Sequence, residues 1–477
     1  MPTDQRPDRR PNRPNIVMVL TDDHAAHAIS AYDDTLLQTP NLDRLADEGM
    51  RFDATYCTNA LCAPSRASIL TGTYSHVNGV RTLTTYFDAA QPTFVSMLRD
   101  AGYQTWLAGK WHLGHGGEHD PQGFDHWEVL DGQGPYWDPE LISEHGRRTV
   151  PGYTTTILTD LAIERIRERD PDRPFCLLLH HKAPHRSWDP DTAHAKLFAD
   201  EDLPEPATLF DDHAGHGRAA REARMRIGRD LNERDLKEPF PPGLTEPERT
   251  RWAYQRYLKD YLRCVVSVDE NTGRLLDVLD DEGLRDDTVV VYSSDQGFFL
   301  GDHGWYDKRF MYDESLRMPL LVRYPPEVPA GSTTDAMALN IDFAQTFLDY
   351  AGLEPLPRMQ GESLRPILRG ERPDGWRDSI YYRYWEHDDE PHHVEAHYGV
   401  RTQRYKLIYY YARGFGLPGA SERTMSPEWE LFDLERDPAE LHNVWADPAY
   451  AAVREELRAE LARLQAQYAD DPCDDLA

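Results

Sequence analysis

IVMVLTDDH, residues 16–24, is the stretch that decides the fold of this chain. Its first five residues are apolar and mostly β-branched, which predicts a strand that is buried on both faces. An abrupt polar run then ends the strand. Similar short apolar runs recur along the chain, at residues 104–108, 175–179, 289–292 and 320–322. Helical patterns separate these runs, so the sequence predicts an α/β fold with a mostly parallel sheet sandwiched by helices.

Punctuation residues mark several of the predicted helices. Thr39-Pro40 opens one helix that Gly49 closes, and Gly102 closes another that runs from Thr93 to Ala101. Proline at the start of a helix and glycine just past its end are the usual signals. A long helical pattern, Ala253 to Asp281, precedes the strand at residues 289–292.

Polar clusters follow four of the predicted strands. In open α/β sheets ligands bind beyond the carboxyl ends of the strands, so these clusters are expected to meet at one site. The clusters are Thr21-Asp22-Asp23-His24, Lys110-Trp111-His112, His180-His181-Lys182-Ala183-Pro184-His185 and Ser293-Ser294-Asp295-Gln296-Gly297.

Four of these side chains form a set of hard oxygen ligands. Asp22, Asp23, Asp295 and Gln296 supply three carboxylates and one amide oxygen, which suits Ca²⁺ or Mg²⁺. A single aspartate in such a place is more often a helix cap or a turn residue. An Asp-Asp pair and an Asp-Gln pair that both end strands favour the metal site.

Basic residues accompany the oxygen ligands. Lys110 and His112 alternate on a segment that we expect to be extended, which would point both side chains the same way. His185 follows Ala183-Pro184, and Lys308 lies in the loop GWYDKRFMYDES. One such group can stabilise an oxyanion while another moves a proton. Taken singly, each reads equally well as a structural histidine or a solvated lysine.

The segment Cys62-Ala63-Pro64-Ser65-Arg66 reads as the start of a helix that Gly72 ends. The amide groups and dipole of a helix N-terminus favour negative charge near Cys62. Arg66 lies four residues on, and therefore on the same face. By itself the pattern also fits a loop that leads into a short helix, with Arg66 in a surface ion pair.

Together these segments resemble the type I, formylglycine-dependent sulfatases of the alkaline phosphatase superfamily. The matching blocks stand in the family's order: TDDH, CAPSR with TGTYSHVNGV, AGKWHLG, HKAPHRSW, SSDQGFFLGDHGWYDKRFMYDESLRMPLLVRYP and GESL. The resemblance implies an alkaline-phosphatase-like fold and oxidation of Cys62 to formylglycine (3-oxoalanine) by a formylglycine-generating enzyme.

The same resemblance assigns roles to the residues of the predicted site. Asp22, Asp23, Asp295 and Gln296 would bind Ca²⁺, or Mg²⁺, together with the formylglycine at Cys62. Arg66, Lys110, His112, His185 and Lys308 would surround the sulfate. A hydroxyl of the hydrated aldehyde would attack sulfur, His185 would protonate the leaving alcohol, and His112 would accept a proton when sulfate leaves. Gln296 departs from the family, in which asparagine is commoner.

Substrate class follows from weaker likenesses. HHKAPHRSWDPD, LFDDHAGHGRAAREARMRI and PHHVEAHYGVRTQRYKLIYYY resemble sulfatases that act on N-acetylglucosamine 6-sulfate, as a small-molecule or oligosaccharide sulfate ester. There the histidines that match His393 and His397 lie near the sugar; they also fit surface or strand histidines. Two alternatives stay open: a phosphonate monoester or phosphodiester hydrolase, and an inactive metal- and glycan-binding homologue with unmodified Cys62.

Changes in composition along the chain predict its domain boundaries. We expect a disordered tail at residues 1–12 and a catalytic domain at 13–375, in which 188–250 is an insertion over the sheet. A C-terminal α+β subdomain at 376–477 would hold an antiparallel strand in RTQRYKLIYYY, residues 401–411, and a charged helix at 447–468.

The composition of the chain limits the kinds of binding partner that we expect. The net charge of −31, from 52 Lys and Arg against 83 Asp and Glu, disfavours nucleic acid and anionic membrane surfaces. No apolar stretch approaches 18 residues and no signal peptide is recognised, so a cytoplasmic location is expected. The oligomeric state cannot be read from the sequence. The five cysteines lack disulfide or metal spacing; they are Cys57, Cys62, Cys176, Cys264 and Cys473.

Overall fold

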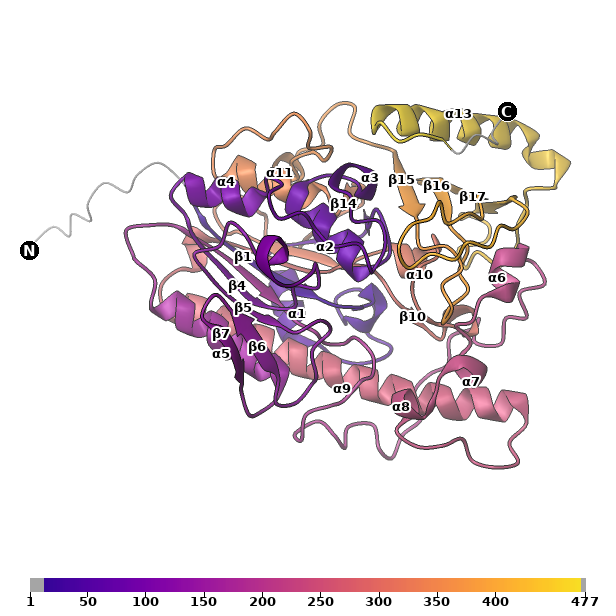
Figure 1. Ribbon diagram of the computed structural model, residues 1–477, viewed down its shortest axis with the longest axis horizontal. Coiled ribbons are helices and arrows are strands. Elements are labelled where there is room, and N and C mark those ends of the chain that lie inside the picture. The colour runs from indigo at the N-terminus through magenta and orange to yellow at the C-terminus, as the bar shows by residue number, and fades with distance from the viewer. Residues whose placement is uncertain (1–12, 473–477) are drawn as a thin grey trace, which may run out of the picture.

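The computed structural model describes residues 13–472 and is built around a ten-stranded sheet (Figure 1). The strand order is β13-β2-β12-β9-β1-β8-β4-β5-β6-β7. The five consecutive strands from β9 to β5 are parallel, whereas β12, β6 and β7 pair antiparallel. The predicted α/β fold with a mostly parallel sheet is confirmed.

The strands of this sheet are β1 (Asn15–Thr21), β2 (Met50–Phe52), β4 (Gln104–Gly109), β5 (His126–Leu130), β6 (Glu140–Ser143), β7 (Gly146–Thr149), β8 (Phe175–His180), β9 (Thr288–Ser294), β12 (Leu320–Arg323) and β13 (Ser332–Thr334). Two short pairs lie apart from it: β3 (Thr55–Tyr56) with β14 (Ala338–Leu339), and β10 (Phe299–Leu300) with β11 (Tyr306–Asp307).

Helices cover both faces of the sheet, as the doubly buried strands require. Successive β1 side chains belong to opposite cores: Val17 and Val19 to one, Ile16, Met18 and Leu20 to the other. Figure 1 shows α5 and α9 on one side and α2, α4 and α11 on the other. The main helices are α1 (Pro40–Asp47), α2 (Cys62–Thr71), α4 (Phe94–Asp100), α5 (Thr154–Arg167), α9 (Glu246–Asp281) and α11 (Asp342–Tyr350).

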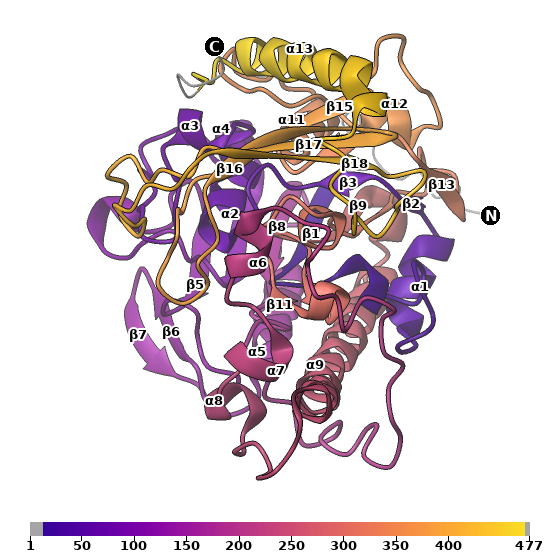
Figure 2. The ribbon, with the colours of Figure 1, turned by 90° about the vertical axis from the view of Figure 1, so that its right-hand side faces the viewer.

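A second, four-stranded antiparallel sheet follows near the C-terminus, with α13 packed over it (Figure 2). Its strands are β15 (Ser379–Tyr384), β16 (His397–Thr402), β17 (Tyr405–Tyr410) and β18 (Glu428–Asp433), and α13 is Ala451–Gln467. The prediction of one strand at 401–411 is wrong. That stretch turns at Gln403-Arg404, where the Thr402 hydroxyl accepts a hydrogen bond from Tyr405 N at 2.9 Å.

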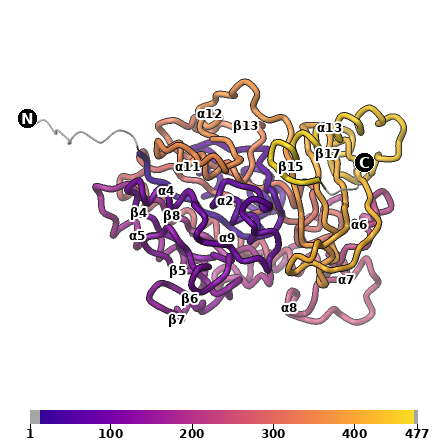
Figure 3. The backbone as a smooth tube through the Cα atoms, turned by 45° about the horizontal axis from the view of Figure 1, so that its top comes forward, coloured from indigo at the N-terminus to yellow at the C-terminus, as the bar shows by residue number. Residues whose placement is uncertain are grey.

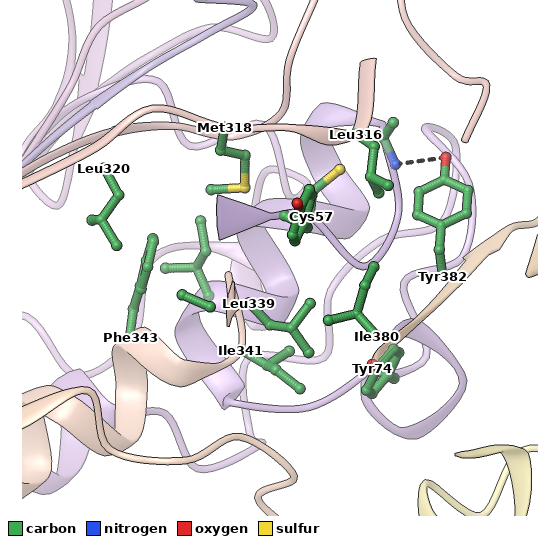
Figure 4. Close-up of a cluster of buried hydrophobic side chains, with 14 of the residues drawn as sticks. Cys57, Tyr74, Leu316, Met318, Leu320, Leu339, Ile341, Phe343, Ile380 and Tyr382 are labelled. Carbon is green, nitrogen blue, oxygen red and sulfur yellow. Dashed lines mark hydrogen bonds between the residues drawn. The ribbon is translucent and has the colours of Figure 1, made fainter. Parts of the chain in front are cut away.

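The second sheet shares a core with the first. Figure 4 shows Ile380 and Tyr382 of β15 beside Cys57, Leu316 and Met318 from the larger sheet's side. The Tyr382 hydroxyl accepts from Ala60 N at 3.1 Å and donates to Arg309 O at 2.6 Å. It therefore touches both the approach to α2 and the loop that carries Lys308. The expected boundary at residue 375 stays a prediction.

The segment at residues 188–250 contains α6 (Arg218–Glu222), α7 (Ile227–Asp230) and α8 (Glu233–Leu236). Helices α7 and α8 pack on α9, and Gly217 N donates to Glu430 Oε1 of β18 at 2.6 Å. Figure 3 shows these helices at the end of the molecule that carries the second sheet. The segment thus links α9 to the second sheet.

Three short helices complete the described chain: α3 (Ser75–Asn78), α10 (Asp313–Leu316) and α12 (Arg365–Leu368). Among residues 13–472 no helix is long and apolar enough to cross a bilayer. The cysteines within that range, Cys57, Cys62, Cys176 and Cys264, are all buried and free. The predicted tail at 1–12 and Cys473 lie outside the described residues.

Candidate active site

The four polar clusters meet at one edge of the large sheet. Strand β1 lies between β8 and β9, and β4 pairs with the far side of β8. The four strands are parallel, so their carboxyl ends reach the same edge. The residues after β1 and β9 touch directly, because Asp23 N donates to Asp295 Oδ1 at 3.3 Å.

Three carboxylates form the centre of the cluster. The side chains of Asp22, Asp23 and Asp295 are fully buried, and one oxygen from each lies within 4.8 Å of the others. Burial raises the pKa of Asp23 to about 6, and burial together with the Asp22 charge raises the pKa of Asp295 to about 7. Such crowding is costly without compensating positive charge.

Gln296 adds an oxygen to the carboxylates. Its Nε2 donates to Asp23 Oδ1, while its Oε1 is buried and has no hydrogen-bond partner. An orphaned amide oxygen beside three buried carboxylates fits the ligand set of Ca²⁺ or Mg²⁺. The longer side chain of Gln296 therefore still reaches the cluster.

Cys62 is the first residue of α2 and faces the same cluster. Its Sγ lies 3.3 Å from Asp22 Oδ1. Burial and the Asp22 charge raise the pKa of the thiol well above its usual range. The unmodified side chain therefore stays protonated, and a protonated thiol is a weak nucleophile.

Arg66 fixes α2 to the ends of two strands. Its Nε donates to Asp295 Oδ2 at 2.9 Å, and its Nη1 donates to the Lys110 carbonyl at 3.0 Å. The side chain is only 1 % exposed. Arg66 is thus a buried partner of a carboxylate, and the alternative of a surface ion pair does not apply.

Two lysines supply positive charge. Lys110 Nζ donates to Asp22 Oδ2, and Lys308 Nζ donates to both oxygens of Asp23 at 2.6 and 2.7 Å. Burial disfavours the charged form of Lys308, yet Asp23 and its neighbours raise the pKa of Lys308 overall. Both ammonium groups therefore stand beside the carboxylates, and Lys308 is not a solvated loop residue.

His112 reaches the site by a different backbone path from the one expected. Its φ is 56°, in the left-handed region, so the segment from Lys110 to His112 is not simply extended. The two side chains nevertheless converge on Gln133. Lys110 Nζ donates to Gln133 Oε1, and Gln133 Nε2 lies 3.2 Å from His112 Nε2. Burial and then Lys110 lower the pKa of His112 well below its usual range.

His185 lies beside the carboxylates from the β8 side. Its Nδ1 lies 2.7 Å from the Arg186 carbonyl, which makes Nδ1 the donor, and its Nε2 lies 3.7 Å from Asp23 Oδ2. Its side chain keeps 12 % of its surface exposed. Burial lowers the pKa of His185 well below its usual range. In the neutral ring the proton therefore sits on Nδ1, and Nε2 directs a lone pair toward the carboxylates.

The two histidines expected near a sugar lie in different settings. His393 is partly exposed and its Nδ1 lies 2.7 Å from Asp388 Oδ1. His397 is fully buried, and its ring stacks on Phe310, Tyr382 and Tyr384. Their roles toward a substrate stay predictions.

Sequence reasoning missed a charged group that adjoins Lys308. Arg309 lies 3.2 Å from Glu386 and 3.6 Å from Asp389, and His392 lies 2.6 Å from Asp389. All four side chains are buried. Arg309 directly follows Lys308, and this position next to a predicted site residue could have identified it. Sequence reasoning also missed Gln133, which contacts Lys110 and His112. It lies between two glycines in a distant loop, where no sequence signal marks it as a site residue.

Comparison with known families covers most of the chain. The Sulfatase family model matches residues 14–353. A second model, N-sulphoglucosamine sulphohydrolase, C-terminal, matches residues 301–467. The overlap of the two matches includes the loop that carries Lys308.

Individual relatives extend over nearly the whole length. An N-acetylglucosamine-6-O-sulfatase of Bacteroides thetaiotaomicron is 44% identical, over 97% of this chain and 88% of that protein. The human N-acetylglucosamine-6-sulfatase is 29% identical, over 91% of this chain and 80% of that protein.

A solved structure is similar throughout. It is described as a complex with the substrate D-glucosamine-2-N,6-O-disulfate, and it superposes with a TM-score of 0.90 at 43% identity, covering 98% of this chain and 100% of that one. The family match, the 44% identical relative and this superposition agree. The chain belongs to the sulfatase family and is a sulfatase.

Proposed function

We propose that this sulfatase hydrolyses the 6-O-sulfate ester of N-acetylglucosamine or N-sulfated glucosamine, with a formylglycine at position 62 and a bound divalent cation, most simply Ca²⁺. One observation carries the proposal. Cys62 Sγ, three buried carboxylates and two lysine ammonium groups meet at the carboxyl edge of the sheet.

Asp22, Asp23, Asp295 and the free Oε1 of Gln296 would hold the cation. The cation would offset the repulsion between an anionic ester and the site. Formylglycine at position 62 would supply a hydrated aldehyde as nucleophile, where the buried thiol cannot serve. Its formation implies a formylglycine-generating enzyme as a partner during maturation.

The basic side chains then act on the sulfate ester. Lys110 and Lys308 contact carboxylates in this structure, and they are placed to neutralise sulfate oxygens that enter beside them. His185 directs Nε2 toward the cluster, and in the doubly protonated ring this nitrogen would protonate the leaving alcohol. Gln133 holds His112 Nε2 as an acceptor, which suits the role of base.

The charged group beside Lys308 is suited to bind the sugar. Asp389 Oδ1 and His392 Nε2 are buried and make no hydrogen bond. Arg309, next to Lys308 in the chain, lies 3.6 Å from Asp389. These two atoms meet their neighbours only as ion pairs, Asp389 Oδ1 with Arg309 at 3.6 Å and His392 Nε2 with Asp307 at 3.5 Å. Their free hydrogen-bonding capacity fits the hydroxyl groups of a sugar and a second anionic substituent. The names of the relatives, which act on glucosamine sulfates, support the same substrate class.

The first test is chemical. Mass spectrometry of the tryptic peptide 52–66 should show one sulfur and two hydrogens of Cys62 replaced by one oxygen, with Cys57 in the same peptide as the unmodified control. Cys62→Ala should abolish sulfate release while the melting temperature is retained. Full activity in protein whose residue 62 is an intact thiol would contradict the mechanism.

The second test concerns the substrate. Turnover should be greatest for glucosamine 6-sulfates in a panel of sulfated sugars that also contains 3-O- and 2-N-sulfated isomers. An aryl sulfate, a phosphonate monoester and a phosphodiester complete the panel. Dominant turnover of a phosphorus ester would favour the phosphonate or phosphodiester alternative. An intact Cys62 thiol together with no turnover of any ester would favour the inactive binding homologue.

A further inference from the structure

A second cluster of metal-binding side chains lies between residues 211–216 and the loop that carries Lys308. Three imidazoles surround one carboxylate oxygen, Asp211 Oδ2. His216 Nε2 lies 2.9 Å from this oxygen, His303 Nδ1 lies 3.2 Å from it, and His213 Nε2 lies 4.0 Å from it. The three histidine side chains are fully buried and Asp211 is 9 % exposed. The cluster shares no residue with the site around Cys62.

The hydrogen bonds around His216 leave one of its nitrogens aimed at a carboxylate. Tyr312 donates its only hydroxyl proton to Glu430 Oε2 at 2.8 Å. Its oxygen must therefore accept from His216 Nδ1, which lies 3.1 Å away. In a neutral ring, Nε2 then turns a lone pair toward Asp211 Oδ2. Either a second proton or a metal ion is needed between these two atoms.

His213 is unexplained by hydrogen bonding. Neither of its ring nitrogens has a partner, although the side chain is 0 % exposed. Its ring stacks on Trp305 with centroids 4.6 Å apart, which holds the imidazole beside Asp211. Buried polar atoms are rarely left unpaired, so an imidazole of this kind calls for a ligand.

The spacing of three of the four side chains fits a tetrahedral ion, because one ligand atom each from Asp211, His216 and His303 lies within 4.8 Å of the others. Zinc bonds to nitrogen and oxygen at 2.0–2.2 Å place neighbouring ligand atoms about 3.3 Å apart. The contacts of Asp211 with His216 and His303 are close to this value. His213 Nε2 lies 4.0 Å from Asp211 Oδ2, so its ring would have to move toward the other three ligands to become the fourth. Imidazole donors favour Zn²⁺ over Ca²⁺.

Outer contacts complete the pattern of a metal site. Histidine ligands are usually oriented by a hydrogen bond at their other nitrogen. For His216 this partner is Tyr312. For His303 the carboxylate at the other nitrogen is Glu314, whose Oε2 lies 3.9 Å from Nε2, beyond hydrogen-bond distance but close enough to form an ion pair with a charged ring. Glu314 Oε2 itself has no hydrogen-bond partner.

We propose that Asp211, His213, His216 and His303 bind one Zn²⁺ ion, with a structural role. The ion would tie residues 211–216 to the loop that carries Lys308, and through Tyr312 to Glu430 of the second sheet. The four protein ligands leave no position for a substrate, as in closed structural zinc sites. The inference does not depend on the chemistry at residue 62.

Metal content tests the proposal directly. Full-length protein is treated with a chelator, returned to excess Ca²⁺ to fill the carboxylate cluster, incubated with Zn²⁺ and dialysed. Elemental analysis should find one zinc per chain in the wild type. Asp211→Asn and His303→Gln should lower zinc affinity at least about tenfold. His194→Gln is the matched control, because His194 is also buried between carboxylates, Asp191 and Glu270.

A second measurement needs no variant and so does not depend on their folding. Co²⁺ added to the chelated, Ca²⁺-loaded wild type should give the strong visible bands of a tetrahedral site, and Zn²⁺ should abolish them. Zinc should also raise the melting temperature of the chelated protein. Absence of retained zinc in the wild type, octahedral cobalt spectra, or equal zinc affinity in Asp211→Asn would each overturn the proposal.

Discussion

At the scale of single residues, sequence motifs identify most of the candidate site but not all of it. Asp22, Cys62, Lys110 and Lys308, from four of the quoted blocks, converge on one site. Asp22 and Lys110 follow parallel strands of the large sheet, Cys62 begins α2, and Lys308 comes from the loop after β11. Gln133 could not be found this way. It comes from a loop between β5 and β6, and no local pattern announces that its amide bridges Lys110 and His112.

Gln133→Ala tests that bridge. Without the amide, Lys110 and His112 lose a shared partner and water enters, so kcat/KM should fall about tenfold. The pKa of His112, which burial now lowers, should rise toward its ordinary value. If His112 is the base, the acidic limb of the pH–rate profile then moves to higher pH. Gln122→Ala, in an exposed loop, should leave both quantities unchanged; an unshifted profile in Gln133→Ala would argue against the bridge.

Gly297 is required by close packing. A Cβ at this position would collide with the carbonyl oxygens of Glu314 and Arg317, the second at 2.6 Å. Gly297→Ala should therefore destabilise the protein by about 1–3 kcal/mol and displace Asp295-Gln296, with a loss of Ca²⁺ affinity by calorimetry. Gly243→Ala, in open space at φ +82°, carries only the backbone penalty. Unchanged Ca²⁺ affinity in Gly297→Ala would show that the backbone after β9 accommodates the added methyl group without displacing Asp295 and Gln296.

At the scale of elements, the sequence predicts the bounds of a helix or strand well where capping or turn residues mark its ends. The predicted helix at 93–101 is α4, Phe94–Asp100, with a capping box at Thr93. The hairpin of β16 and β17 was missed because its turn contains no glycine, proline or asparagine. The Thr402 side chain closes that turn instead.

Helix α12 is fixed by an ion pair that gives a pH-dependent prediction. Hydrogen bonds from Arg365, and then from Arg369, lower the pKa of Glu327 to about 2, against an ordinary value of 4.5. A depressed folded-state pKa stabilises the protein above about pH 4.5, and this stability disappears as the pH falls toward 2. Glu327→Gln should therefore cost about 1–2 kcal/mol near neutral pH.

The measurement compares the free energy of unfolding of Glu327→Gln and wild type as a function of pH. Their difference should shrink steadily from pH 4.5 downward. Glu354→Gln, which changes an exposed glutamate, should track the wild type throughout. A difference that is constant with pH would assign the effect to packing and not to charge.

At the scale of the whole molecule, the net charge of −31 opposes the approach of an anionic ester. Salt screens this repulsion: the Debye length falls from about 30 Å at 0.01 M to about 8 Å at 0.15 M. We expect kcat/KM to rise a few-fold over this range while kcat stays constant. A fall in kcat/KM would show that the local charges of Lys110, Lys308 and Arg66 dominate the field that a substrate meets.

The packing of the two sheets against each other could not be predicted from the sequence. Local patterns predict each sheet, but no local pattern shows that Ile380 and Tyr382 pack in the same core as Met318, or that Tyr382 touches the Arg309 carbonyl. These contacts join residues more than sixty positions apart. Only the folded chain shows that the second sheet supports the loop that carries Lys308.

The burial of Cys62 sets an order of events in the life of the molecule. Its side chain is 1 % exposed and faces Asp22, inside a cluster that also requires Asp295 and Lys308. These partners are synthesised more than 230 residues later. If residue 62 carries the proposed formylglycine, the enzyme that oxidises it must reach Cys62 while the chain is still open, so modification and folding compete. Under the proposed mechanism a chain that folds first stays inactive, and the fraction of active enzyme is decided during synthesis.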